Sequence, residues 1–171
     1  ATWIWHWRAS PALTMFFEQV SGLDEKRGPV LVQLPPSLAF NPRVARSFFA
    51  TLREFHPGHI VCEPRHPTWF GSAAEDLFVI HRVARVATDP SRIPAALSPG
   101  GWMGEAGAGE RPVTYYRLHG SPRKYWSRNP LDRIRRWAEE LRCHTANGNV
   151  WCIFDNTASG AAAENALEMA A

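Results

Sequence analysis

Short apolar runs alternate with stretches of helical periodicity along most of this chain. The runs are typical of strands buried on both faces, and they cover residues 30–34, 60–63, 84–89, 114–120 and 150–154. Between them, apolar residues recur at helical spacing over 42–55, 72–83, 130–143 and 161–170. Strand and helix signals that alternate every thirty residues or so, roughly the length of a βα unit, predict a parallel sheet with right-handed crossovers.

The amino-terminal segment breaks this pattern. In A-T-W-I-W-H-W-R-A, tryptophan occupies positions 3, 5 and 7, and this alternation predicts a strand with one aromatic face. The alternative is a start that comes from a truncated or shifted reading frame, because no partner strand follows nearby. A helix is then predicted from Ser10, which suits an N-cap, and Pro11, which suits a first helical turn.

The stretch I-V-C-E-P-R-H-P-T-W, residues 60–69, is where a strand signal ends most abruptly. Its prolines lack a backbone donor and stop the strand, which leaves Glu63, Arg65 and His66 at the exit. Ligands of parallel α/β proteins bind at the carboxyl ends of the strands. Polar residues also end the other strands, namely Gln33, Asp89, Arg117, His119, Asp155 and Asn156. We therefore expect these side chains to converge on one face.

Two parallel architectures fit this pattern, an open doubly wound sheet and a barrel. No G-x-G-x-x-G or G-x-x-x-x-G-K-[ST] sequence follows any strand, which argues against the open sheets that bind nucleotides. Polar residues at the carboxyl ends of several strands fit the active face of a barrel. The sequence therefore predicts an α/β protein of the TIM-type (β/α) barrel class.

Glu63 is the first candidate for acid–base catalysis. A carboxylate that leaves an apolar strand is partly desolvated, which raises its pKa towards the range useful for proton transfer. The alternative is a structural ion pair with Arg65 or Arg117. In the same way, Arg65 and Arg117 either clamp an anionic substrate group or neutralise the Glu63 carboxylate.

His119 and Asp89 complete the predicted catalytic set. An imidazole titrates near neutral pH, which suits His119 for acid–base chemistry. Asp89 precedes a proline, where Asp also commonly caps a turn. Together with Glu63 and His66 these residues could form a nitrogen and oxygen set for a metal, but no local spacing supports a metal site, and none is predicted.

Four further residues are candidates for substrate binding, each with a structural alternative. His66 lies at the strand exit, and Gly120 permits close backbone approach or an unusual φ. Tyr125 lies in a basic and aromatic loop, residues 123–128, which could grip nucleic acid or a phosphosugar or simply cover the sheet. Asn156 could orient a substrate through its amide, or form a turn.

Composition indicates one folded domain. A length of 171 residues, with 45% hydrophobic and 20% charged residues, argues against disorder. The formal net charge of +3 forms no basic run. The three cysteines lack C-x-x-C spacing, and no apolar stretch reaches the roughly eighteen residues of a membrane helix. Without a signal-peptide pattern either, we expect a cytoplasmic protein that does not contact membranes.

Several motifs together resemble the YecE-like family, also described as domain of unknown function 72. They are L-V-Q-L-P-P, C-E-P-R-H-P-T-W, T-D-P-S-R-I-P, Y-R-L-H-G and F-D-N-T, in this order. The resemblance implies a TIM-type barrel of about eight strands, of which residues 10–171 would hold about strands four to eight, with strands one to three missing and residues 1–9 atypical. The matching positions are Glu63, Arg65, His66, Trp69, Asp89, Arg117, His119, Gly120 and Asn156.

The resemblance implies no reaction and leaves the cofactor unknown, because the family's activity is unassigned. The first hypothesis is an enzyme that acts on a phosphorylated or otherwise anionic small molecule or nucleotide by acid–base chemistry. One alternative is a non-catalytic module that binds nucleic acid or protein through residues 123–128. Another is an inactive truncated fragment, whose free sheet edges could pair in a homodimer.

Overall fold

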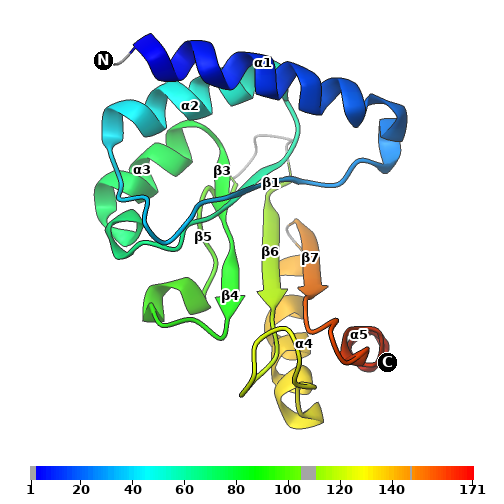
Figure 1. The fold of residues 1–171 in the computed structure, drawn as a ribbon. Coiled ribbons are helices and arrows are strands. Elements are labelled where there is room, and N and C mark those ends of the chain that lie inside the picture. Colours follow the sequence, from blue (N-terminus) through cyan, green and yellow to red (C-terminus); the bar gives the residue numbers. More distant parts are fainter. Residues whose placement is uncertain (1–2, 105–110, 147) are drawn as a thin grey trace.

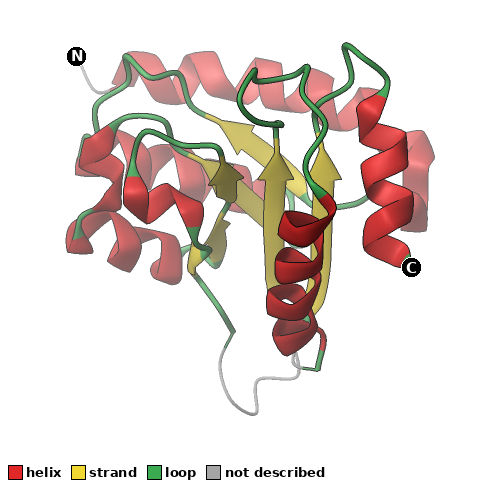
Figure 2. Cartoon of the chain, turned by 90° about the horizontal axis from the view of Figure 1, so that it is seen from below, coloured by secondary structure: helices red, strands yellow, loops and turns green. Residues whose placement is uncertain are grey.

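The computed structural model of the protein describes residues 3–104, 111–146 and 148–171. It contains two sheets with helices packed against them (Figures 1 and 2). The first sheet has the strand order β1-β2-β3-β5, and the second has the order β4-β6-β7. The strands are β1 (Val30–Gln33), β2 (Ile60–Glu63), β3 (Val83–Arg85), β4 (Ala87–Asp89), β5 (Gly100–Gly101), β6 (Val113–Leu118) and β7 (Asn149–Phe154).

Helices alternate with most of the strands, as the sequence predicts. They are α1 (Trp3–Gln19), α2 (Pro42–Phe55), α3 (Ser72–Ile80), α4 (Leu131–Thr145) and α5 (Ala161–Ala170), with short 3₁₀ segments η1 (Ser21–Lys26), η2 (Pro67–Phe70) and η3 (Pro94–Leu97). Asn41 starts α2, because its side chain accepts hydrogen bonds from the first amides of the helix. No helix in the described ranges is long and apolar enough to cross a membrane.

The barrel prediction is wrong, and so is the assignment of the chain to strands four to eight of an incomplete barrel. The strands form two open sheets, and no strand of the described part of the chain closes either of them. The division falls between β3 and β4. There the Arg85 side chain turns to Glu75, which accepts its hydrogen bond at 2.6 Å, and the backbone of Arg85 pairs with Gly100 of the antiparallel β5. The sheet of β3 therefore ends at β5, while β4 starts a second sheet with β6.

The parallel pairing itself is confirmed. Strand β2 pairs in parallel with both β1 and β3, and β6 pairs in parallel with both β4 and β7. Within the described residues, the antiparallel exception is β5, which lies in a glycine-rich stretch between β4 and β6. Part of that stretch, residues 105–110, lies outside the described residues.

The strand predicted for the first nine residues is wrong as well. Helix α1 runs from Trp3 past Ser10 and Pro11, so the helix does not start at Ser10. Packing against the end of α2 accounts for its stability. The ring of Phe17 lies 6.0 Å from the ring of Phe55 and 5.5 Å from that of His56. Tertiary packing stabilises most helices more than local preference does. The alternation of tryptophan therefore did not determine the secondary structure of this segment.

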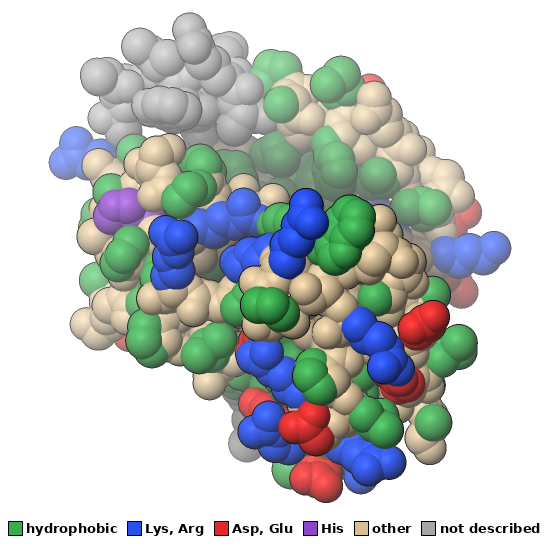
Figure 3. Space-filling model, turned by 60° about the horizontal axis from the view of Figure 1, so that its bottom comes forward, with side chains coloured by type: hydrophobic (Ala, Val, Ile, Leu, Met, Phe, Trp, Pro, Cys, Tyr) green, Lys and Arg blue, Asp and Glu red, His purple; other side chains and the backbone are tan. Residues whose placement is uncertain are grey.

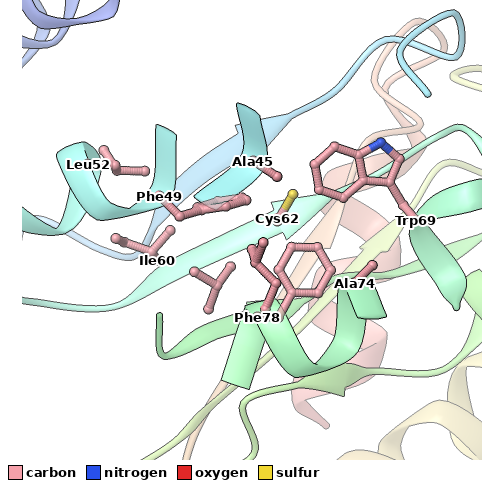
Figure 4. Packing of buried hydrophobic residues seen from close by; sticks show 10 residues of the cluster. Ala45, Phe49, Leu52, Ile60, Cys62, Trp69, Ala74 and Phe78 are labelled. Atoms are coloured by element: carbon pink, nitrogen blue, oxygen red, sulfur yellow. The ribbon is translucent and has the colours of Figure 1, made fainter. Parts of the chain in front are cut away.

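Three apolar clusters hold the layers together. The first fills the space between the first sheet and helices α1, α2 and α3, and Figure 4 shows Phe49, Ile60, Cys62, Trp69 and Phe78 converging there. The second packs α4 and α5 against β6 and β7. The third lies between the two sheets and is built from residues of both, namely Val61, Ala84, Val86, Val113 and Tyr115. The two sheets therefore share an inner core, and their strand ends face common space.

Candidate functional site

Glu63, at the carboxyl end of β2, is the centre of a buried polar cluster. The residue is 1% exposed. Its Oε1 accepts a hydrogen bond from Arg65 Nε at 2.8 Å, and its Oε2 accepts one from Gln33 Nε2 at 3.1 Å. Arg117 of β6 also donates to Oε2 and forms an ion pair with the carboxylate. Donors from three segments of the chain therefore surround this carboxylate.

Arg117 extends the cluster from the first sheet to the second. Its guanidinium pairs with Glu63 on one side and with Asp155, just after β7, on the other. Asp155 Oδ2 also lies 3.1 Å from Nδ1 of His119, whose side chain is 1% exposed. Residues from the ends of β1, β2, β6 and β7 thus lie together, as the positions of the strand exits suggest.

Both carboxyl groups of the cluster stay ionised despite their burial. Burial raises the pKa of Glu63, but hydrogen bonds from Arg117 and Arg65 outweigh this effect and hold the pKa below its usual range. Burial also raises the pKa of Asp155, where His119 and Arg117 outweigh it and lower the pKa overall. At neutral pH, Glu63 is therefore a carboxylate with occupied oxygens and a poor proton donor.

A cavity of about 210 Å³ lies beside this cluster, and we name it the carboxyl-end cavity. It brings four of the predicted residues together, because Glu63, Arg65, His119 and Tyr125 all line it. The other lining residues are Pro36, Pro64, Thr88, Ser91, Arg92, Ile93, Ala96 and Lys124. The walls therefore combine strand ends with the segment after β4 and the loop after β6.

Positive charge predominates around the carboxyl-end cavity. Arg65, Arg92 and Lys124 line it, whereas Glu63 is the one acidic group among the described lining residues. Burial, and next the neighbouring Arg65, lowers the pKa of Lys124. Figure 3 shows Lys and Arg side chains spread across the face that lies at the bottom of Figure 1. An anion in this cavity would meet positive charge that the protein does not itself balance.

Asp89 and His66 lie outside the lining of this cavity. Asp89 accepts two hydrogen bonds from Nη2 of Arg133 on α4, at 2.6 and 2.7 Å, and the Arg133 guanidinium lies over the ring of Trp137. His66 caps η2, because its Nδ1 accepts from the amide of Thr68 and lies 2.9 Å from the hydroxyl of that residue. These contacts give both side chains structural roles. Asp89 meets His119 through the backbone alone, because its carbonyl oxygen accepts a hydrogen bond from the His119 amide at 2.8 Å.

The loop after β6 places Tyr125 over His119. The Tyr125 amide donates to the His119 carbonyl oxygen at 2.6 Å, and the two rings lie 5.0 Å apart. Gly120 permits this fold of the loop, since its φ is +82° and a Cβ there would lie 2.2 Å from the carbonyl oxygen of Ser127. Gly120 is thus required by backbone packing, whereas Tyr125 faces the cavity.

Asn156 belongs to a buried amide network instead of the cavity lining. Its Nδ2 donates to the Ser127 carbonyl oxygen at 3.0 Å and to Asn165 Oδ1 at 2.9 Å. Asn165 Oδ1 also accepts from the amide of Asn129. This network fixes α5 against the loop that leads to α4, so Asn156 supports the architecture around the site.

The alternative metal set is not assembled, because His66 and Asp89 point to other partners than Glu63 and His119. Within residues 3–104, 111–146 and 148–171, no three His, Cys, Asp or Glu side chains are placed to hold a metal ion.

Several basic side chains of the loop 123–128 already have partners within the protein. Arg128 forms ion pairs with Glu164 and Glu168 of α5. The Arg123 guanidinium lies 4.5 Å from the ring centroid of Trp126. Lys124 and Tyr125 line the carboxyl-end cavity. This arrangement suits a wall of the cavity better than an extended surface for nucleic acid.

Three residues of the site were not among the predicted site residues. Arg92 and Lys124 line the cavity, and each is close in sequence to a predicted residue, in T-D-P-S-R-I-P and in R-K-Y. Basic residues beside a strand exit are the signal that could have identified them. Asp155 stands at the end of a strand, but no local feature of the sequence indicates that it meets His119.

A second cavity, of about 470 Å³, lies at the amino ends of β1 and β7, and we name it the amino-end cavity. Gly28 and Trp151 meet there, since a Cβ at Gly28 would lie 2.8 Å from the indole ring. Asn149 Nδ2 lies 3.1 Å from His59 Nε2. His56 also lines this cavity, and burial, together with nearby Arg27, lowers its pKa. No carboxylate of the described residues lines this cavity.

Comparisons with known proteins confirm the family resemblance. A family model described as "Protein of unknown function DUF72" matches residues 5–171, so most of the tryptophan-rich start lies within the match rather than outside it. No curated protein matches the sequence.

Solved structures of DUF72 family proteins share the fold. One from Thermotoga maritima MSB8 has a TM-score of 0.71 and 22% sequence identity, and the match covers 92% of this chain and 63% of that one. Two structures of one protein from Enterococcus faecalis V583 each have a TM-score of 0.69, with identities of 20% and 21%. The match to them covers 92% of this chain and 63% and 66% of theirs. The chain thus spans less than two thirds of the length of these structures.

Proposed function

This chain belongs to the DUF72 family of proteins of unknown function, and we propose that its carboxyl-end cavity binds a phosphorylated or otherwise anionic small molecule on which His119 performs acid–base chemistry. The observation that carries this proposal is the charge around the cavity. Three cationic side chains line it, and its one described carboxylate already accepts hydrogen bonds from Arg65, Arg117 and Gln33.

In this proposal, Arg92 and Lys124 bind the anionic group of the ligand. Both are exposed, and no ion pair to a described carboxylate engages either of them. A charge-assisted hydrogen bond from such groups is shorter and stronger than a neutral one. Arg65 contributes to the same field, although its Nε is bound to Glu63.

His119 is the proposed acid–base group. Its Nδ1 lies beside the Asp155 carboxylate, which favours the tautomer with the proton on Nδ1 and leaves Nε2 as the proton acceptor. Asp155 then stabilises the imidazolium that forms when Nε2 takes a proton from the ligand. Glu63 acts as a positioning residue, because it holds Arg65 and Arg117 in place and has no free oxygen for proton transfer.

Titration calorimetry with inorganic phosphate and with a phosphorylated sugar tests the binding step. We expect Lys124→Met and Arg92→Met to weaken binding about tenfold each, because each removes one charge-assisted hydrogen bond. Arg27→Met is the matched control, since Arg27 is an exposed cation of the amino-end cavity, and it should leave binding unchanged. Equal affinity in all four proteins would contradict the proposal.

Turnover of a panel of phosphorylated compounds, followed by NMR, tests the chemical step. We expect His119→Gln to abolish the conversion of any compound that the wild-type chain consumes, while phosphate binding remains. Asp155→Asn should lower the rate and shift its pH dependence, since it changes the group that orients the imidazole. Full turnover in His119→Gln would remove His119 from the mechanism.

We propose that the protein is located in the cytoplasm. All three cysteines are free, and two of them are fully or partly buried. Free thiols are compatible with a reducing compartment, which supports the cytoplasm as the proposed location.

A further inference from the structure

The loop after β6 brings Lys124 and Tyr125 into the wall of the carboxyl-end cavity. Its backbone adopts an unfavourable conformation there, because Tyr125 has a φ of +64°. A residue other than glycine pays free energy for this left-handed conformation, which persists only where the surrounding structure holds it in place. The contacts that hold the loop at Tyr125 therefore also set the position of Lys124 beside it.

Hydrogen bonds hold the backbone of Tyr125 on both sides. Its amide donates to the His119 carbonyl oxygen at 2.6 Å, and its own carbonyl oxygen accepts from the Ala158 amide at 3.0 Å. The carbonyl oxygen of Trp126 accepts a further hydrogen bond from the Ser159 hydroxyl. The segment between β7 and α5 thus supports this part of the loop.

Asn165 on α5 holds the other end of the loop through a buried amide. The residue is 0% exposed. Its Oδ1 accepts hydrogen bonds from the amide of Asn129 and from Asn156 Nδ2, each at 2.9 Å. Its Nδ2 donates to the Asn129 carbonyl oxygen at 3.2 Å and to Glu168 Oε2 at 2.9 Å. Both donors and both acceptor positions of this side chain are therefore in use.

These contacts require an amide at position 165. A carboxylate there would place an oxygen against the carbonyl oxygen of Asn129 and the carboxylate of Glu168, whereas alanine would leave buried polar groups without a partner. Asn156, which donates to Asn165, also donates to the carbonyl oxygen of Ser127 at 3.0 Å. Asn165 therefore supports the loop at two points, directly at Asn129 and through Asn156 at Ser127.

We propose that Asn165 is a positioning residue of the carboxyl-end cavity, which fixes the loop so that Lys124 meets the anionic group of the ligand. This role rests on the proposed function, because it requires Lys124 to bind the ligand. It extends the binding machinery to α5, from which no described residue lines the cavity. The contacts that carry the proposal all lie between residues 119 and 168.

Titration calorimetry with inorganic phosphate in a double-mutant cycle tests this role. We expect Asn165→Ala to weaken phosphate binding about fivefold, because a loosened loop no longer directs Lys124 to the ligand. In the Lys124→Met background, where no ammonium remains to be positioned, the same substitution should change the affinity less than about twofold. In the Arg92→Met background the loss should again be about fivefold, since Arg92 follows β4 and lies outside the loop.

A merely structural role of Asn165 predicts different results. Asn165→Ala would then lower the Tm and leave the phosphate affinity of the folded chain unchanged, or it would weaken binding equally in all three backgrounds. Either result overturns the role of Asn165, while phosphate binding by the wild-type chain would still support the proposed function. A wild-type chain that binds no phosphate refutes the proposed function, and the role of Asn165 in binding with it.

Ser159→Ala is a milder variant that keeps the test decisive if Asn165→Ala does not fold. It removes an exposed hydrogen bond to Trp126, and we expect phosphate binding to weaken about threefold in the wild-type background and not in the Lys124→Met background. Equal losses in these two backgrounds would show that the support of the loop does not act through Lys124.

Hydrogen exchange without any ligand tests the support of the loop by itself. The amides of Tyr125 and Ala158 should exchange at least about fivefold faster in Asn165→Ala than in the wild-type chain, and this change should exceed that of the β2 amides. Exchange at Tyr125 that changes no more than exchange in β2 overturns the claim that Asn165 holds the loop.

Discussion

At the carboxyl ends of the strands, Arg117 joins the two sheets through ion pairs with Glu63 and Asp155, whereas at the amino ends Trp151 packs on Gly28. The same two sheets are therefore linked by buried charges at one end and by uncharged contacts at the other. Both ends also contain a cavity, but cationic side chains surround only the carboxyl-end cavity on several sides.

The contrast shows which end of the molecule is built for a ligand. Burying charges destabilises a protein unless hydrogen bonds and opposite charges compensate, and apolar packing of similar size is often as stabilising. The amino ends show that these sheets can be joined without buried charge. The charged cluster at the carboxyl ends is therefore better explained by the chemistry of the cavity beside it than by stability.

The largest effect is expected from the link at the carboxyl ends. Arg117→Met leaves Glu63 and Asp155 without their shared partner, and breaking a buried pair of this kind lowers the free energy of unfolding by about 3–5 kcal/mol. Arg133→Met is the matched control, because it removes an ion pair with a single carboxylate, Asp89, and the Arg133 side chain is more exposed than that of Arg117; we expect a loss of about 1–2 kcal/mol. Urea unfolding measures both losses of unfolding free energy. Equal losses would contradict a larger contribution of the Arg117 ion pairs to stability.

A smaller effect is expected at the amino ends. Gly28→Ala places a methyl group against the Trp151 indole, and such overpacking typically destabilises by about 1–3 kcal/mol. Gly22→Ala is the control, since no atom lies within 4 Å of a Cβ there, and its stability should stay nearly unchanged. If Trp151→Ala does not relieve the loss in the Gly28→Ala protein, the contact between these two residues is not its cause.

The two ends should also respond to acid in different pH ranges. The pKa of Glu63 and that of Asp155 are lowered in the folded protein, so their stabilisation is present above about pH 4 and is lost as the pH falls through the folded values. The pKa of His56 is lowered from 6.5, by burial first. The unfolded chain therefore takes up a proton earlier than the folded one, and stability already begins to fall below about pH 6.5.

Unfolding free energies measured at successive pH values separate these ranges. His56→Gln should reduce the loss of stability that begins below about pH 6.5 and should leave the loss below about pH 4 unchanged. The reduction should be at most about 1.4 kcal/mol for each unit by which the pKa of His56 differs between the folded and the unfolded chain. The pKa of His81 is also lowered, so part of the pH dependence of stability in the upper range should remain in the His56→Gln protein. An upper range that is unchanged in His56→Gln would show that His56 does not control it.

The sequence predicts what depends on local pattern and misses what depends on distant contacts. The buried run before Glu63 and the proline after it define a strand exit on their own, so the position of this residue could be predicted. The partner of Asp89 could not, because Arg133 lies on α4, far along the chain. The same reason applies to the fold, since the turn of Arg85 towards Glu75 and β5 divides the sheet through contacts that no periodicity records.

The histidine signals in an NMR titration with inorganic phosphate test the central claim most directly, because one spectrum reports on both ends of the molecule. His119 lines the carboxyl-end cavity, and His56 and His59 line the amino-end cavity. We predict that the His119 ring signals shift saturably with phosphate, that Lys124→Met weakens this shift about tenfold, and that the other two histidines stay unchanged. Saturable shifts of His56 or His59 with a silent His119 would contradict the account.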